Sequence, residues 1–309
     1  MALLTPIDMT ALAARMANLD EVKGRSLWAD ARLRFFRNKA AVAGVVLLAF
    51  CATYALFGQL IAAHTYDFQN YDIMGEASKS GPNWAEGYYF GADQQGRDLF
   101  ARTAMGTRIS LIVGLIATAI SVTLGTLYGA VSGYLGGRVD AVMMRLVDIL
   151  MSIPYLFVLI LFLVMFGRSL SVLYLAIGLL SWPGMARIVR GQTLTLKGRE
   201  YIEAAQATGV SSFRIIIRHI VPNLMGIVVV YATLLVPDVI IGESFISFLG
   251  LGVQEPQTSL GTLISDGAKS VYYNTQWEIA FPIAFFMMVM FGFYFVGDGL
   301  RDALDPKDR

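Results

Sequence analysis

Charged residues are scarce in this chain. Only 15% of its 309 residues are Asp, Glu, Lys or Arg, against roughly 25% in ordinary soluble domains, whereas 56% are hydrophobic. The single cysteine, Cys51, excludes an intrachain disulfide. With only two histidines, His64 and His219, the chain has too few soft ligands for a dedicated metal site. The composition therefore indicates a membrane protein that binds no metal of its own.

Sequence motifs for enzymatic chemistry are also missing. No Gly-Lys dipeptide occurs, so the chain has no phosphate-binding loop of the G-x-x-x-x-G-K-[ST] type and cannot hydrolyse ATP by that route. Neither a G-x-S-x-G elbow nor an H-E-x-x-H zinc motif is present. We therefore predict no catalytic residue and no cofactor in this chain.

Long apolar blocks are what the chain has instead. A helix needs roughly 20 apolar residues to cross a hydrocarbon core about 30 Å thick. Six blocks qualify, at residues 40–63, 109–134, 149–167, 170–186, 224–242 and 279–297. The fold class is therefore an all-α membrane protein with six transmembrane helices. If the N-terminus is cytoplasmic, 18 of the 24 Lys and Arg residues lie on the cytoplasmic side, as the positive-inside rule requires.

The chain divides into three segments by this interpretation. Residues 1–25 are a cytoplasmic tail, and residues 26–108 hold an interfacial helix, the first transmembrane helix and a periplasmic loop. Residues 109–309 form the main transmembrane domain, with five helices and a cytoplasmic loop at 191–223. Ser26 can cap the interfacial helix, whose apolar stripe includes Ala31 and Phe35.

Three glycines in the second block recur at four-residue spacing, at Gly125, Gly129 and Gly133. This spacing puts them on one face of a helix, where another helix can approach closely. We favour packing within this chain over a contact between copies.

The stretch EAAQATGVSSFRIIIRHIVPN, residues 203–223, is polar between two apolar blocks. It predicts a helix over 197–208 and a left-handed terminator at Gly209. Ser211 or Ser212 then caps a second helix over 213–220, which Pro222 ends. The first helix exposes small side chains around Glu203, and the second buries one apolar face: Phe213, Ile216, Ile217 and Ile220. The arrangement predicts a rigid docking knob for another protein.

Ionisable groups within a span are costly and are therefore functional candidates. Asp238 is the clearest case, and Glu243 lies close to it in sequence. We assign both, from their depth alone, to a translocation pathway.

The polar stretch resembles a known family. The spacing E-A-A, three residues, then Gly, followed by an apolar helix and Pro-Asn, is similar to the cytoplasmic loop of binding-protein-dependent ABC importer permeases. Three further stretches look like the second permease subunit of oligopeptide and dipeptide importers: FGADQQGRDLF (90–100), SFLGLGVQEP (247–256) and GDGLRDALDPKDR (297–309). The resemblance covers about residues 26–309.

This resemblance implies a type I importer fold in the bacterial inner membrane, with both termini cytoplasmic. It also implies a homologous second permease, two ATPase subunits that bind ATP and Mg, and an extracytoplasmic peptide-binding protein. Glu203, Ala204, Ala205 and Gly209 match the coupling helix that docks on an ATPase. Two alternatives stay open within the transporter class: a related importer of nickel, glycans or modified peptides, and an ion-driven secondary carrier. A structural membrane subunit is a third.

Overall fold

The computed structural model describes residues 27–304, and every regular element among them is helical. The elements are α2 (Leu27–Arg37), α3 (Lys39–Ile61), α4 (Leu99–Leu135), α5 (Gly137–Ser152), α6 (Tyr155–Phe166), α7 (Leu170–Lys197), α8 (Glu200–Ala207), α9 (Ser212–Ile215), the π-helical turn η1 (Ile216–Ile220), α10 (Val221–Phe248), α11 (Leu260–Ser270), the 3₁₀ turn η2 (Val271–Tyr273) and α12 (Trp277–Leu304). The predicted tail, 1–25, and the predicted cap, Ser26, lie outside the described residues.

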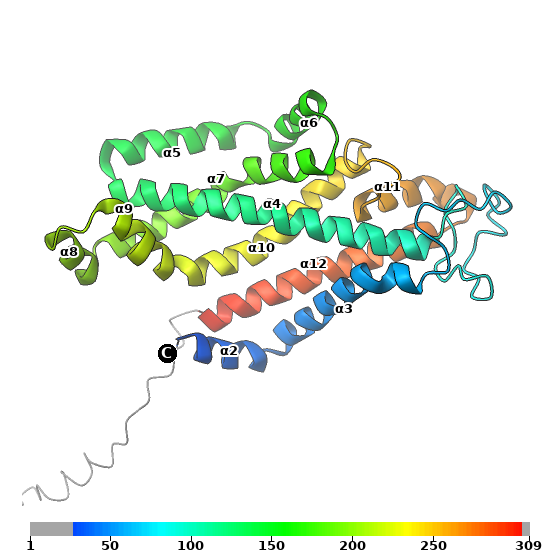
Figure 1. The fold of residues 1–309 in the computed structure, drawn as a ribbon, viewed down its shortest axis with the longest axis horizontal. Coiled ribbons are helices and arrows are strands. Elements are labelled where there is room, and N and C mark those ends of the chain that lie inside the picture. Colours follow the sequence, from blue (N-terminus) through cyan, green and yellow to red (C-terminus); the bar gives the residue numbers. More distant parts are fainter. Residues whose placement is uncertain (1–26, 305–309) are drawn as a thin grey trace, which may run out of the picture.

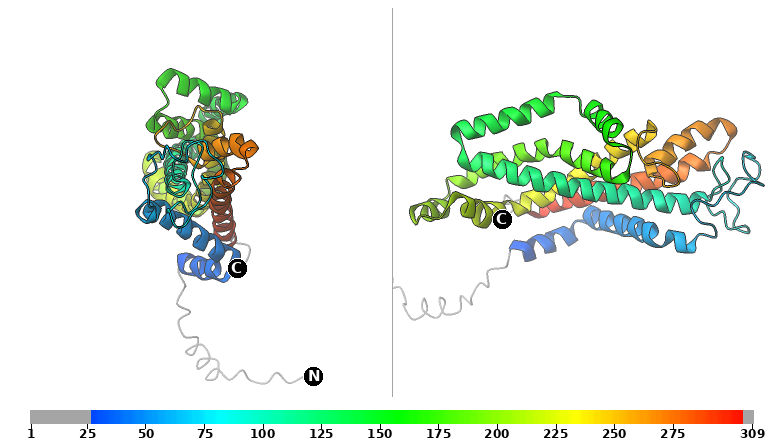
Figure 2. Two further views of the ribbon diagram at one scale, coloured as in Figure 1. Left: turned by 90° about the vertical axis from the view of Figure 1, so that its right-hand side faces the viewer. Right: turned by 45° about the horizontal axis from the view of Figure 1, so that its top comes forward.

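The long helices α3, α4, α7, α10 and α12 run side by side along the molecule (Figure 1). The hairpin of α8 and α9 lies at one end, and residues 62–98 with α11 lie at the other (Figures 1 and 2). Among the described residues, five helices are long and apolar enough to cross a membrane, and there are six candidate spans if the bent pair α5–α6 is counted as one. The predicted all-α fold is confirmed, with five to six candidate spans against the six predicted.

The third span differs from its prediction. We expected one span over 149–167, and α5 and α6 meet within it at an angle of 83°. The break falls at Ile153, whose backbone is extended, and Pro154. Proline disfavours the helical conformation in the residue before it, which explains why the chain turns at this point.

The predicted helix-packing face of α4 is confirmed as a contact within the chain. A side chain at Gly125, Gly129 or Gly133 would collide with successive turns of α7, at Trp182, Ala186 and Arg190. These collisions involve backbone atoms of α7, so only glycine lets the two helices approach this closely.

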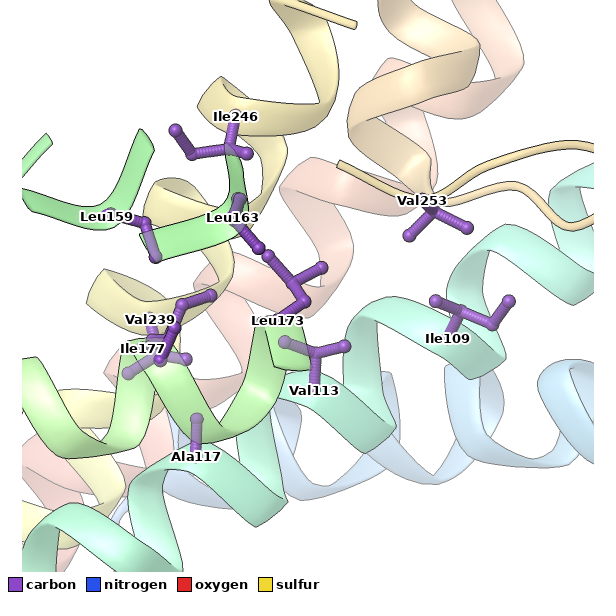
Figure 3. Close-up of a cluster of buried hydrophobic side chains, with 11 residues drawn as sticks. Ile109, Val113, Ala117, Leu159, Leu163, Leu173, Ile177, Val239, Ile246 and Val253 are labelled. Carbon is purple, nitrogen blue, oxygen red and sulfur yellow. The ribbon is translucent and has the colours of Figure 1, made fainter. Parts of the chain in front are cut away.

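An apolar core joins the broken span to the bundle (Figure 3). Leu159 and Leu163 of α6 are at most 1% exposed, and they lie among side chains of α4, α7 and α10. Helix α2, which the sequence predicts to be interfacial, is anchored separately, because its buried stripe residues Ala31 and Phe35 pack near Ala303 of α12. Helix α2 and the last turns of α12 are thus tied to the same bundle.

Candidate functional site

The α8–α9 hairpin presents polar and small side chains outward. Glu203 and Ala204 are exposed, and Ala205 is half-buried. On the opposite side of the hairpin, Ile202 of α8 and Ile215 of α9 are completely buried in one cluster with α4 and α7. The exposed face therefore belongs to an element that is fixed firmly to the bundle.

Gly209 has the left-handed conformation that its position predicts. Its φ is +78°, and its N–H donates to the carbonyl of Gln206 at 3.0 Å. The N–H of Val210 reaches back to the carbonyl of Ala205 at 3.1 Å. This pair of hydrogen bonds is the Schellman arrangement, which satisfies the last carbonyls of α8 and reverses the chain in a defined direction.

The second half of the hairpin departs from its prediction in two ways. Phe213 does not pack on the bundle, because its side chain is 76% exposed, and Ile217 is 40% exposed. The buried face is formed by Ile215, Ile216 and Ile220. The helix begins one residue earlier than predicted, at Ser212.

Pro222 does not end this helix, contrary to the prediction. Helix α9, the π turn and α10 form one continuous helical segment, Ser212–Phe248. Proline cannot donate a hydrogen bond and clashes with the carbonyl four residues earlier. The π turn widens the helix just before Pro222, with the Val221 N–H bonding to the carbonyl of Ile216, and thereby accommodates the ring.

The first half of the loop is also shorter than predicted. Helix α7 continues to Lys197, so residues 191–197 of the predicted loop belong to it, and α8 begins only at Glu200. The break lies at Gly198 and Arg199. Consequently the hairpin stands directly on the end of α7 and at the start of α10.

The opposite end of the molecule is held by buried charges. Arg97 donates to Asp93 at 2.7 Å and to Glu255 at 2.8 Å, and Arg102 lies 3.3 Å from Asp93. Burial lowers the pKa of the Arg97 guanidinium, but the two carboxylates outweigh this effect and raise it. The hydrogen bond from Arg97 correspondingly lowers the pKa of Glu255. This network joins residues 62–98 to the segment after α10.

A cavity of about 170 Å³ lies beside this network. Its walls come from residues 93–97, from α11 and from the start of α12. Asp266 and Lys269 of α11 contribute opposite charges to it, and Gln94 closes one side by donating to Glu278 at 2.9 Å. Sequence reasoning did not find this cavity, because it joins residues 93–97 to a segment, 266–278, that is distant in the chain.

The two predicted pathway residues occupy different environments. Asp238 is exposed on the surface of α10, with the Tyr294 hydroxyl of α12 within hydrogen-bonding reach. Glu243 is 0% exposed and accepts hydrogen bonds from Ser110, Ser244 and Ser247. The structure therefore does not bring the two carboxylates into one site. The signal for the Glu243 cluster was the spacing of Glu243 and Ser247, one helical turn apart.

Comparisons with known proteins agree with this architecture. Residues 121–309 match the family described as binding-protein-dependent transport system inner membrane component, and residues 26–82 match the N-terminal transmembrane domain of oligopeptide transport permease C. The chain is 54% identical over 289 residues to the oligopeptide transport system permease protein OppC of Escherichia coli strain K12, covering 94% of each chain.

Two further relatives match over a similar length of the chain. The OppC permease of Haemophilus influenzae is 51% identical over 290 residues, which is 94% of this chain and 91% of the relative. The dipeptide transport system permease protein DppC of Bacillus subtilis is 43% identical over 292 residues, which is 94% of this chain and 89% of the relative.

Proposed function

This chain belongs to the family of inner membrane components of binding-protein-dependent transport systems, and from that membership we propose that it is a permease subunit of an ATP-driven importer of oligopeptides or dipeptides. The peptide substrate is supported by the relatives, whose names specify oligopeptide or dipeptide transport. The observation that carries the mechanism is the α8–α9 hairpin, which exposes small side chains on a rigidly anchored support.

Glu203, Ala204, Ala205 and Gly209 form the proposed coupling site. Small side chains let an ATPase subunit approach the backbone of α8, and the Glu203 carboxylate offers one charge-assisted hydrogen bond. The buried Ile202 and Ile215 transmit a push on this surface to the bundle, because closely packed side chains transmit strain. Gly209 sets the angle between the two arms of the hairpin.

The energy source lies in partner subunits under this proposal. Two cytoplasmic ATPases bind ATP and Mg, since this chain has no phosphate-binding loop. A homologous second permease completes the pathway, and an extracytoplasmic binding protein delivers peptide to the opposite end. Asp238 is proposed to face the second permease or the pathway, because an exposed carboxylate within a span is costly in lipid.

The proposed orientation places α8 and both termini in the cytoplasm, and residues 62–98 with α11 on the outer face. Residues 1–25 are then a cytoplasmic tail, 26–108 the interfacial helix, first span and outer loop, and 109–309 the core permease domain. To test this, Cys51 is replaced, and single cysteines are introduced at the exposed positions Ser78 and Ser211. An impermeant thiol reagent added to whole cells should label the first and spare the second, and the reverse pattern would overturn the orientation.

The coupling site is tested by reversing one charge. Glu203→Lys should insert normally, because the side chain is exposed, but should lose copurifying ATPase subunits and peptide uptake. Glu86→Lys is the matched control, since Glu86 is an equally exposed acid at the opposite end. It should retain the ATPases. Normal ATPase binding by Glu203→Lys would remove Glu203 from the proposed site.

A further inference from the structure

Glu243 is a fully buried carboxylate at a junction of three helices. It belongs to α10, and it accepts hydrogen bonds from Ser247 at 2.6 Å and from Ser244 at 3.3 Å. The third donor is Ser110 of α4, at 3.1 Å. A buried carboxylate is expensive unless it is satisfied in this way, so its presence calls for a role that an apolar side chain could not perform.

The Glu243 cluster also holds the start of α11. The Ser110 hydroxyl, while donating to Glu243, accepts the backbone N–H of Leu260 at 3.2 Å. Leu260 is the first residue of α11, and the side chain of its N-cap residue, Ser259, lies within hydrogen-bonding reach of Glu243. A carboxylate near the N-terminus of a helix is favoured by the helix dipole. Glu243 thus connects α4, α10 and α11 through short polar contacts.

Backbone contacts reinforce this attachment. A side chain at Gly261 of α11 would collide with the backbone of Ser244, so the two helices touch directly. Farther along α11, the hydroxyl of Ser265 donates to the carbonyl of Phe248 at 3.0 Å. The first half of α11 is therefore fastened to the last turns of α10.

The other end of α10 is the coupling hairpin. Residues Ser212–Phe248 form one continuous segment of 37 residues, which corresponds to a length of about 55 Å. Figure 1 shows this segment running from α9 to the region of α11. One continuous helical segment therefore has the proposed ATPase-docking hairpin at one end and the Glu243 cluster at the other.

We propose that Glu243 is a positioning residue that locks α11 onto α10, so that movement of the α8–α9 hairpin reaches the outer cavity through a single helix. The proposal rests on the proposed function for the identity of the hairpin. Helix α11 supplies Asp266, Lys269 and Ser270 to the cavity wall, so displacing α11 changes the shape and charge of that cavity. Glu243 consequently acts on transport without touching the peptide.

The lock is tested first by a measurement that needs no transport. Ser265→Cys in a chain with Cys51→Ala places a thiol where α11 meets α10, 4% exposed. This thiol should react slowly with an impermeant reagent. Adding Glu243→Leu or Ser110→Ala should raise the labelling rate of this thiol roughly tenfold, which is the change expected from losing one hydrogen bond to a charged group. Glu243→Gln, which keeps an acceptor oxygen, should fall between.

Ser121→Ala is the matched control for Ser110→Ala. Ser121 is also completely buried in α4, and its hydroxyl has no hydrogen-bond partner among the described residues. It should leave the labelling rate unchanged. Equal rates in the parent, Glu243→Leu and Ser110→Ala would overturn the lock, and if Glu243→Leu does not insert, Ser110→Ala and Glu243→Gln decide the question.

The link to transport is tested in the assembled complex by the ratio of peptide-stimulated to basal ATPase activity. Ser110→Ala and Glu243→Gln should retain the ATPase subunits and basal activity but lower this ratio, whereas a loss of folding would lower both activities together. Faster labelling of the Ser265→Cys thiol together with an unchanged ratio of stimulated to basal ATPase activity would overturn the proposal that α10 transmits movement to the cavity. If peptide does not stimulate ATPase activity in the parent complex, the proposed function is overturned instead. The labelling rates would still show whether Glu243 holds α11 on α10.

Discussion

Substitutions of Gly209 test the proposed coupling role of the α8–α9 hairpin, because backbone strain and steric collision can be separated at this position. Its φ of +78° is disfavoured for any residue with a side chain, at a cost of roughly 1–2 kcal/mol. No atom lies within 4 Å of the position that a Cβ would occupy. Within this chain the effect of a substitution is therefore backbone strain, which lowers the population of the observed turn by a factor of about 5 to 30.

We expect Gly209→Ala to weaken ATPase binding by that factor and Gly209→Val to weaken it more, since β-branched side chains tolerate this conformation least. Gly209→Asn should stay close to the parent, because asparagine adopts the left-handed conformation readily. The matched control is Gly198→Ala, at the end of α7. Gly198 has an ordinary φ of −86° and an equally open surrounding, so its substitution should have no effect.

The assay is the affinity of purified ATPase subunits for the permease in detergent, together with peptide uptake in cells, at matched levels of inserted protein. Both measurements should rank the variants as parent, Asn, Ala, Val. The reasoning fails if Gly209→Val is inserted normally and still binds the ATPases and imports peptide as well as the parent. It also fails if Gly198→Ala is as damaging as Gly209→Ala.

Three further predictions concern stability and docking. Gly129→Leu should destabilise the α4–α7 contact by roughly 1–3 kcal/mol and lower the melting temperature in detergent, because it would collide with backbone. Arg97→Gln should cost about 3–5 kcal/mol by leaving buried Asp93 with less compensation, whereas Lys79→Gln, in an exposed ion pair, should leave the melting temperature almost unchanged. Phe213→Ala should keep the melting temperature and weaken ATPase binding, whereas Ile215→Ala should lower the melting temperature.

Hydrophobic blocks predicted the number of spans but not the ends of the helices. Helix α4 begins at Leu99, ten residues before the apolar block at 109, and most of these ten residues are buried against other parts of the chain. Asp98 caps it by accepting the N–H of Phe100 at 2.8 Å. The hydrophobic block at 149–167 does not show the break at Pro154 either, because the apolar composition is continuous there even though the helix is not.

The sequence predicted those features of the α8–α9 hairpin that depend on neighbouring residues alone. The left-handed turn at Gly209 follows from one residue type, and the small side chains of α8 are visible in the sequence. Burial of Phe213 was predicted wrongly, since helical periodicity gives the spacing of apolar residues but not which of them a partner covers. The part that Ser110 plays in the Glu243 cluster was beyond sequence reasoning, because Ser110 is separated from Glu243 by 133 positions.

The chain is held together by two kinds of contact, close backbone packing between the long helices and buried ion pairs at one end. Within the membrane, apolar side chains gain little by leaving lipid for protein, so the helices are joined by close backbone contact, as at Gly129. At the end of the molecule opposite the α8–α9 hairpin, buried charges such as Arg97 also fix segments to one another. An element that transmits movement between these regions has to be rigid in both. The helical segment Ser212–Phe248 is continuous from one region to the other. Variants that block transport without loosening the bundle are therefore expected at the two ends of this segment, at Gly209 and Glu243, rather than along its sides.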